Sequence, residues 1–302
     1  MPVRRQTAIV SGVPVRGLWR TMRGRSIRFS LCRRVVDDGL HFAKQMPTVP
    51  VERRMDLSRL RIALREVDNA PNWSAIFLKG FALVAREMPE LCRVYLPWPR
   101  PHLYEYPVSI GVLPLEREHD EGETGLFPYL ISNPAARSLL DITADIRHAK
   151  DAPWRGIKQF RRMLAVARLP RLLRRTLWGF GFNVGRFRSR YFGTFLVTTV
   201  GPAGASTMHP IAPVTTTIGY GQFLAGGNID VRGIFDHRVL DGLPMARALV
   251  RLDEVLNNEI LNEIRTGAAS TPAKPCNLTT EQQAAMRVRR HDAPRWSAPF
   301  DP

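Results

Sequence analysis

Cysteine is scarce in this 302-residue sequence, which contains Cys32, Cys92 and Cys276 and no others. Three cysteines are too few for a disulfide framework, and none stands at the short spacing by which cysteines bind zinc. The seven histidines offer no metal-ligand spacing either. We therefore expect no metal site, and we expect a reducing, cytoplasmic setting.

Long apolar runs are also absent, because no stretch reaches the roughly 18 residues that a membrane-spanning helix needs. The sequence has no glycine-rich phosphate loop and none of the named nucleic-acid recognition motifs, so we expect no nucleic-acid partner. Its hydrophobic content of 44% and charged content of 24% are those of an ordinary globular protein. The chain is therefore long and apolar enough to bury a sizeable core.

Acidic residues are missing from residues 152–228, and the whole chain carries a formal net charge of +17. Eleven basic residues lie in this stretch: Arg155, Lys158, Arg161, Arg162, Arg168, Arg171, Arg174, Arg175, Arg186, Arg188 and Arg190. Apolar residues interleave with them on both sides of Pro170, which predicts two amphipathic helices. We interpret residues 153–192 as a basic helical elaboration. It could be a solvated helix pair, a docking surface for an acidic carrier domain, or a contact with an anionic membrane surface.

The most informative motif is the stretch 235–242, Phe-Asp-His-Arg-Val-Leu-Asp-Gly. Before it, residues 228–235 alternate between apolar and polar side chains, which predicts a strand. After it, apolar residues recur at helical spacing over residues 243–260. His237 therefore stands in a tight turn between a strand and a helix. Rigid elements on both sides can hold an imidazole in one orientation, as a catalytic base requires.

Five further segments accompany this motif, namely residues 46–60, 77–91, 108–112, 125–131 and 193–201. The last of them reads Gly-Thr-Phe-Leu-Val-Thr-Thr-Val-Gly. In these segments, their order and the motif Asp-His-Arg-Val-x-Asp-Gly, the chain resembles the catalytic core of dihydrolipoamide acyltransferases from 2-oxo acid dehydrogenase complexes. The shorter pattern His-x-x-x-Asp-Gly also resembles that of chloramphenicol acetyltransferase.

The resemblance implies an α/β protein with the coenzyme A-dependent acyltransferase fold, in which helices cover a mixed central sheet, and it implies a homotrimer. We assign residues 1–25 to a basic N-terminal arm, residues 26–266 to the catalytic domain and residues 267–302 to a polar, loosely ordered tail. The stretch before the catalytic domain is too short for a lipoyl domain. We therefore expect a stand-alone form.

The resemblance also implies roles for individual residues. It makes His237 the base that takes a proton from the acceptor, with its other ring nitrogen bonded to the carbonyl group of His237 itself. It gives Asp241 a structural role, paired to an arginine that shapes the site. It assigns the oxyanion donor to Thr198, with Thr199 as the alternative if the alignment shifts by one position. We further expect Gly242 to let the following helix approach the sheet closely.

The implied function is transfer of an acyl group between coenzyme A and the dihydrolipoyl group of a carrier domain on another chain. Coenzyme A and its thioester are then substrates, and no covalent acyl-enzyme is needed. The resemblance identifies no residue that contacts coenzyme A. Two other classes stay open: an acyltransferase for a small alcohol or amine, and a non-catalytic scaffold. An acidic lipoyl or acyl carrier domain is an expected partner, and an anionic membrane surface is the alternative.

Local patterns predict the remaining elements. Strands are expected over residues 48–55, 106–113, 126–131, 195–200 and 213–224. Helices are expected over residues 56–67, with Asp56 as the cap, over residues 72–88, and over residues 138–150, with Ser138 as the cap. The acidic residues 116–123 predict a solvated hairpin tip.

Overall fold

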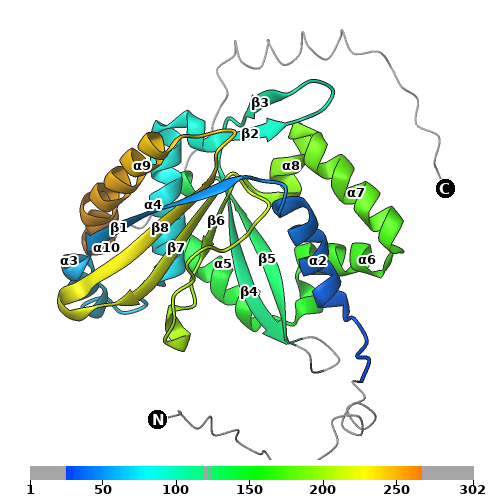
Figure 1. The fold of residues 1–302 in the computed structure, drawn as a ribbon. Coiled ribbons are helices and arrows are strands. Elements are labelled where there is room, and N and C mark those ends of the chain that lie inside the picture. The colour runs from blue at the N-terminus through cyan, green and yellow to red at the C-terminus, as the bar shows by residue number, and fades with distance from the viewer. Residues whose placement is uncertain (1–24, 119–121, 123, 267–302) are drawn as a thin grey trace, which may run out of the picture.

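The computed structural model describes residues 25–118, 122 and 124–266 (Figure 1). Nearly all of the expected basic arm and the whole of the expected polar tail lie outside these residues. Half of the acidic hairpin tip lies outside them as well. The described part contains the expected catalytic domain almost completely.

A six-stranded sheet in the order β1-β8-β7-β6-β4-β5 forms the centre of the fold. Its strands are β1 (Thr48–Asp56), β4 (Ile110–Glu118), β5 (Thr124–Ser132), β6 (Phe195–Thr198), β7 (Thr216–Phe223) and β8 (Asn228–Asp236). Strand β6 runs parallel to its neighbours β4 and β7, whereas the other pairs are antiparallel. The predicted mixed sheet is therefore confirmed. A separate hairpin of β2 (Arg93–Leu96) and β3 (His102–Glu105) lies at the top of Figure 1.

Helices pack on this sheet, and α4 and α5 begin where their caps predict. Helix α4 (Trp73–Glu87) starts after Asn72, whose side chain accepts a hydrogen bond from the Ala75 amide at 2.8 Å. Helix α5 (Leu139–Asp151) starts after Ser138, which accepts from the Asp141 amide at 3.0 Å. Helix α9 (Gly242–Val255) follows the central motif and continues through the π-helical turn Leu256–Ile260 into α10 (Leu261–Thr266). The predicted helix boundaries are therefore confirmed to within a few residues at these places.

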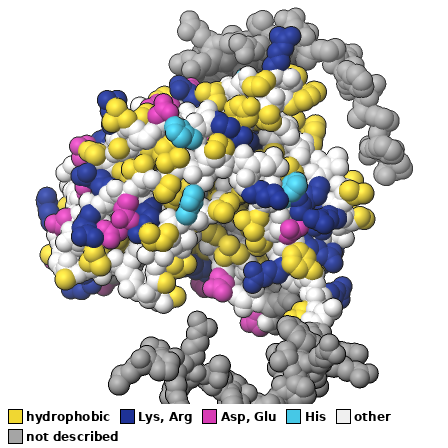
Figure 2. All heavy atoms as spheres, viewed as in Figure 1, with side chains coloured by type: hydrophobic (Ala, Val, Ile, Leu, Met, Phe, Trp, Pro, Cys, Tyr) yellow, Lys and Arg dark blue, Asp and Glu magenta, His cyan; other side chains and the backbone are white. Residues whose placement is uncertain are grey.

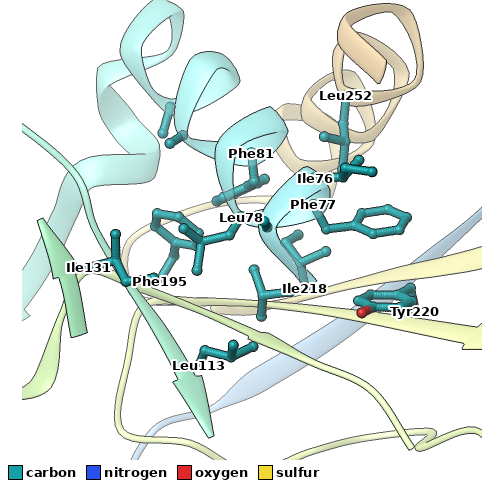
Figure 3. Close-up of a cluster of buried hydrophobic side chains, with 14 of the residues drawn as sticks. Ile76, Phe77, Leu78, Phe81, Leu113, Ile131, Phe195, Ile218, Tyr220 and Leu252 are labelled. Carbon is teal, nitrogen blue, oxygen red and sulfur yellow. The ribbon is translucent and has the colours of Figure 1, made fainter. Parts of the chain in front are cut away.

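The core lies between α4 and the sheet. Figure 3 shows Phe77, Leu78 and Phe81 of α4 close to Phe195 of β6 and Ile218 of β7. Each of these five side chains is at most 1% exposed. Complete burial of such a side chain stabilises a fold by about 1.5–3 kcal/mol. This packing fixes β6 and β7, and β7 is a neighbour of β8, the strand that leads into the central motif.

The first helix after β1 starts later than predicted. Strand β1 keeps its register with β8 as far as Asp56, which pairs with Asn228. Asp56 is therefore a strand residue, and its carboxylate accepts a hydrogen bond from the Ser58 amide at 2.9 Å. Helix α3 runs only over Ser58–Arg65. The prediction of Asp56 as a helix cap was wrong because the long pairing with β8 makes Asp56 the last residue of the strand.

The basic elaboration contains three helices where the sequence predicted two. They are α6 (Lys158–Arg168), α7 (Arg171–Asn183) and α8 (Gly185–Phe192). The predicted break at Pro170 is confirmed. The second break follows Asn183, where Gly185 packs so tightly against the ring of Tyr104 that a Cβ atom would lie 2.7 Å from it. Together with α2 (Leu31–Ala43), these helices form the right-hand side of Figure 1.

Three of the eleven basic residues are not on the surface patch that the sequence predicted. Arg174 is buried, and its guanidinium group pairs with the fully buried carboxylate of Asp38 in α2. Arg175 also forms an ion pair with Asp38, at 2.8 Å, and donates a hydrogen bond to Asp37 at 2.7 Å. Arg188 is buried as well, and burial lowers its pKa to about 10, so it stays charged at neutral pH. A charge is buried only with partners, and these partners lie far away in the sequence.

Replacing Arg174 with glutamine should lower the free energy of unfolding by about 1–3 kcal/mol, because it removes charged hydrogen bonds from a buried carboxylate. Asp38 keeps Arg175, so the loss should stay below that of an isolated buried charge. The matched control is Arg171→Gln, since Arg171 is exposed on the same helix. It should change stability by no more than about 0.5 kcal/mol. Equal effects in urea denaturation would contradict the buried pairing.

Candidate active site

The central motif forms a tight turn between β8 and α9, as the sequence predicted. The amides of Val239 and Leu240 donate to the Asp236 carbonyl at 3.0 and 3.2 Å, which closes the turn. The amide of His237 donates to the Pro47 carbonyl at 2.8 Å, which ties the turn to the segment before β1. His237 is therefore held from both sides by regular structure. Its side chain is still 50% exposed and is accessible to a substrate.

The orientation of the imidazole is set by a carbonyl group. Nδ1 of His237 lies 3.1 Å from the Leu240 carbonyl oxygen. Because a carbonyl oxygen can only accept, Nδ1 must carry the proton in this bond. Nε2 is then the nitrogen with the free lone pair, which is the form that a general base needs. The sequence-based expectation of a bond to the carbonyl of His237 itself was wrong, because the turn brings the Leu240 carbonyl into that position.

Asp241 and Gly242 differ from their expected roles. The side chain of Asp241 is 82% exposed, and among the described residues its ion-pair partner is His237, at 3.4 Å, and not an arginine. Gly242 begins α9, but a Cβ atom at that position would meet nothing within 4 Å. The predicted close approach of this glycine to the sheet was therefore wrong. A glycine that does let α9 approach the sheet closely is Gly233 in β8, where a Cβ would lie 2.5 Å from the sulfur atom of Met245.

The acid that organises the turn is Asp236, which sequence reasoning missed. Its carboxylate is fully buried and accepts from the Arg238 backbone amide at 3.1 Å and from the Arg238 side chain at 2.9 and 2.7 Å. The guanidinium group of Arg238 also stacks on the Tyr95 ring, 4.5 Å from its centroid. An arginine–carboxylate pair does shape this site, but it belongs to the residues on either side of His237. Strand alternation places Asp236 on the face opposite Phe235 and gave no sign that its carboxylate is buried.

Asp236→Asn should lower the free energy of unfolding by about 1–3 kcal/mol, because the buried acceptor loses its charge opposite Arg238. Asp241→Asn should change it by no more than about 0.5 kcal/mol, because that side chain is mostly in water. Chemical denaturation of both variants measures the difference. The prediction fails if Asp241→Asn is the more damaging of the two, since Asp241 would then have a partner like the arginine that the resemblance implies.

Thr198 and Thr199 lie at the carboxyl end of β6 and have different surroundings. The hydroxyl group of Thr199 donates to the Tyr220 carbonyl at 2.9 Å and accepts from the Gly201 amide at 3.0 Å. It is therefore occupied in holding the strand end. The hydroxyl group of Thr198 forms no hydrogen bond with the part of the chain that the structure describes, and the residue is only half-buried. Of the two, Thr198 is the one that can donate to a substrate.

His237 and Thr198 lie at opposite ends of the sheet within one chain. Thr198 pairs with Gly219 of β7, which in turn pairs with Arg232 of β8. His237 comes five positions after Arg232, so the two residues are roughly 16 Å apart along the strand direction alone. The structure therefore does not bring these two predicted site residues together. A site that uses both must take them from different copies of the chain.

A cavity of about 810 Å³ opens at the same end of the sheet as Thr198. Thr199, Trp73, Tyr220 and Phe223 are among its lining residues. The hydroxyl group of Tyr220 lies 3.0 Å from that of Ser74, and burial raises the pKa of Tyr220 to about 12. The tyrosine is therefore neutral at physiological pH. The cavity gives this end of the sheet a largely apolar space of substrate size.

Metal ligands and membrane-spanning helices were also sought in the described residues. In residues 25–118, 122 and 124–266, no three His, Cys, Asp or Glu side chains are grouped so that they could hold a metal ion. Within the same residues no helix is long and apolar enough to cross a membrane.

Comparison with known proteins identifies the fold. No family model matches the sequence, and no curated protein matches it. Solved structures do match. A probable dihydrolipoamide acetyltransferase from Listeria monocytogenes has 16% identity and a TM-score of 0.57, with 78% of this chain and 94% of that chain covered. A truncated catalytic core of the 2-oxoacid dehydrogenase multienzyme complex from Thermoplasma acidophilum has 19% identity and a TM-score of 0.56, with 78% and 99% covered.

A third match is the dihydrolipoamide acetyltransferase of Azotobacter vinelandii, with 17% identity and a TM-score of 0.57. The match covers 83% of this chain and 98% of that chain. A serine, a histidine and an asparagine of that enzyme were studied for their role in its catalytic mechanism. At these identities the likeness shows a shared fold. The predicted acyltransferase fold is therefore confirmed.

Proposed function

We propose that the chain is an acyltransferase that moves an acyl group between coenzyme A and a thiol acceptor, with His237 as the general base. The observation that carries this proposal is the bond from Nδ1 of His237 to the Leu240 carbonyl, which leaves Nε2 as the proton acceptor. The imidazole is half-exposed and lies on a turn fixed by β8 and α9. The likeness in fold to acetyltransferase cores supports the same chemistry.

The proposed reaction is direct transfer between two bound substrates. Nε2 of His237 takes the proton from the acceptor thiol, and the resulting sulfur atom attacks the thioester carbonyl carbon of acyl-coenzyme A. The hydroxyl group of Thr198 donates a hydrogen bond to the oxyanion that forms. When the carbonyl bond re-forms, the bond to the coenzyme A sulfur breaks, and this sulfur takes the proton back from the imidazole. Each group ends in its starting state, so no acyl-enzyme is needed.

The proposed site lies between two subunits. His237 and Thr198 lie at opposite ends of the sheet in one chain, so the turn of one copy must meet the β6 end of the next. A closed assembly of copies repeats this contact at every interface, and we propose a trimer, which is the assembly that the resemblance implies. The half-exposed His237 and Thr198 are both accessible to a neighbouring chain.

We further propose that the acceptor is the dihydrolipoyl group of a carrier domain on another chain. The Azotobacter vinelandii protein is a dihydrolipoamide acetyltransferase, and the histidine and asparagine studied in it are four positions apart, as His237 and Asp241 are. An asparagine in that place also agrees with the exposed position of Asp241, which needs no negative charge to hold the turn.

A direct assay tests this function. The purified protein should convert an acyl-coenzyme A and dihydrolipoamide into acyl-dihydrolipoamide and free coenzyme A, both identified by mass spectrometry. Acyl-coenzyme A that co-purifies with the protein indicates which acyl group to supply. Transfer to a small alcohol or amine, but not to dihydrolipoamide, would contradict the proposed acceptor. Absence of transfer to any acceptor, with acyl-coenzyme A unbound, would contradict the proposed enzyme.

A further inference from the structure

Helix α7 exposes apolar side chains where a surface helix normally exposes polar ones. Leu172 and Phe180 are 85% and 60% exposed, and Leu173 and Leu177 are 49% and 47% exposed. These four residues lie at positions that share one side of a helix. We call them the outer face of α7. A cluster of large exposed apolar side chains of this kind marks a surface that contacts something else.

The opposite side of α7 explains why the helix can be oriented in this way. Arg174 is buried there by its ion pair with Asp38. Trp178 and Phe182 also lie on this side, where both contact the Phe42 ring of α2 at centroid distances of 6.2 and 4.8 Å. The inner side of α7 therefore has its own partners within the chain. Turning the outer face inward would break all of these contacts.

The outer face continues onto α8 through a row of aromatic rings. The ring of Phe180 lies 5.8 Å from that of Phe187, which lies 6.4 Å from that of Tyr191. Tyr191 is itself 54% exposed. The result is an apolar strip that runs from the start of α7 to the end of α8.

Positive charge borders this strip. Arg168 is exposed at the end of α6 and Arg171 at the start of α7, and Arg186 and Arg190 are exposed on α8. Residues 152–228 contain no acid, and the neighbouring acids Asp37 and Asp38 of α2 are already paired with arginines of α7. Figure 2 shows Lys and Arg side chains gathered on the right, over α2, α6 and α7, with hydrophobic side chains beside them.

We propose that the apolar strip and its bordering arginines dock this protein on an anionic lipid surface. Helices that lie in a lipid interface insert apolar side chains below the headgroups and place cationic side chains against the phosphates. Binding of an acidic carrier domain would require cationic side chains over the whole contact surface. Arg174 and Arg175, in the middle of α7, instead point inward and pair with acids of α2. The proposal goes beyond acyl transfer and does not depend on it.

The test is binding of the full chain to vesicles. The protein should sediment with vesicles of phosphatidylglycerol and phosphatidylcholine but not with vesicles of phosphatidylcholine alone. The double variant Leu172→Gln/Phe180→Gln should lower the partition coefficient at least about tenfold, because two large apolar side chains no longer enter the interface. Arg168→Gln/Arg171→Gln should lower it to a similar degree, and the loss should shrink at high salt.

A matched control distinguishes binding through this strip from nonspecific binding of vesicles by other exposed apolar side chains. Ile62 and Leu140 are 56% and 49% exposed on α3 and α5, so Ile62→Gln/Leu140→Gln removes similar apolar side chains elsewhere. This variant should bind vesicles like the unaltered chain. Every variant keeps the arginine-rich residues 1–25, so their contribution is the same throughout.

Three results would overturn the proposal. Unchanged vesicle binding by Leu172→Gln/Phe180→Gln would show that the strip does not touch lipid. Dissociation of an oligomer by the same change, measured by light scattering, would make the strip a contact between subunits. If the arginine variant lost binding to a polyglutamate peptide and kept binding to vesicles, an acidic protein would be the partner.

Discussion

Replacing His237 with alanine should lower turnover by a factor of about 10²–10⁴, which is the usual contribution of a positioned general base. The structural reason is the bond from Nδ1 to the Leu240 carbonyl, which leaves Nε2 as the only ring nitrogen able to accept a proton. The free energy of unfolding should change by no more than about 0.5 kcal/mol, because half of the side chain is already in water. Binding of acyl-coenzyme A should be retained, since no proton moves until the acceptor arrives.

His102 provides the matched control for this experiment. Its Nδ1 also lies close to a carbonyl oxygen, that of Arg100 at 2.7 Å, and it is exposed on β3 outside the motif. His102→Ala should leave turnover unchanged. Steady-state kinetics measures the turnover of both variants, and thermal unfolding measures their stability. If the two histidine variants lost activity equally, or if His237→Ala lost it only by unfolding, the assignment of the base would be wrong.

The sequence predicted secondary structure best where a local pattern of residues is sufficient to determine it. Asn72 and Ser138 cap helices because a side-chain oxygen before an apolar run satisfies the first free amides, which needs no information from elsewhere. The strand before His237 could be predicted for a similar reason, because a strand with one buried face alternates between apolar and polar residues. These features place the histidine correctly between β8 and α9.

Contacts between distant parts of the chain could not be predicted from such local patterns. Arg174 belongs to a stretch without acids, so the sequence pattern placed it on the surface. Its partner Asp38 is 136 positions away, and only the packing of α7 on α2 brings them together. Asp236 was missed for a related reason. Its burial depends on Arg238 and on Tyr95 from another hairpin, whereas Asp241 looked important because a family motif contains it.

Thr198→Val should reduce transition-state stabilisation by about 2.7–4 kcal/mol, because it removes a hydroxyl group at the β6 end that forms no hydrogen bond with the described residues. Thr198→Ser keeps the donor and should keep most of the activity. Thr199→Val is the neighbouring control. That change removes the bonds to the Tyr220 carbonyl and the Gly201 amide, so it should lower stability more than it lowers catalysis by folded protein. Rate constants and denaturation curves for the three variants separate these roles.

Mixing the two inactive chains tests whether the site lies between subunits. Each interface would take His237 from one chain and Thr198 from the next, since the sheet keeps these residues roughly 16 Å apart along the strands of a single chain. In a random assembly of equal amounts of His237→Ala and Thr198→Val chains, about a quarter of the interfaces would combine an intact histidine with an intact threonine. Co-expression should therefore restore about a quarter of the activity of the unaltered protein. Assemblies that stayed inactive, or a chain that light scattering showed to be a monomer, would mean that one chain holds the whole site and that Thr198 is not its oxyanion donor.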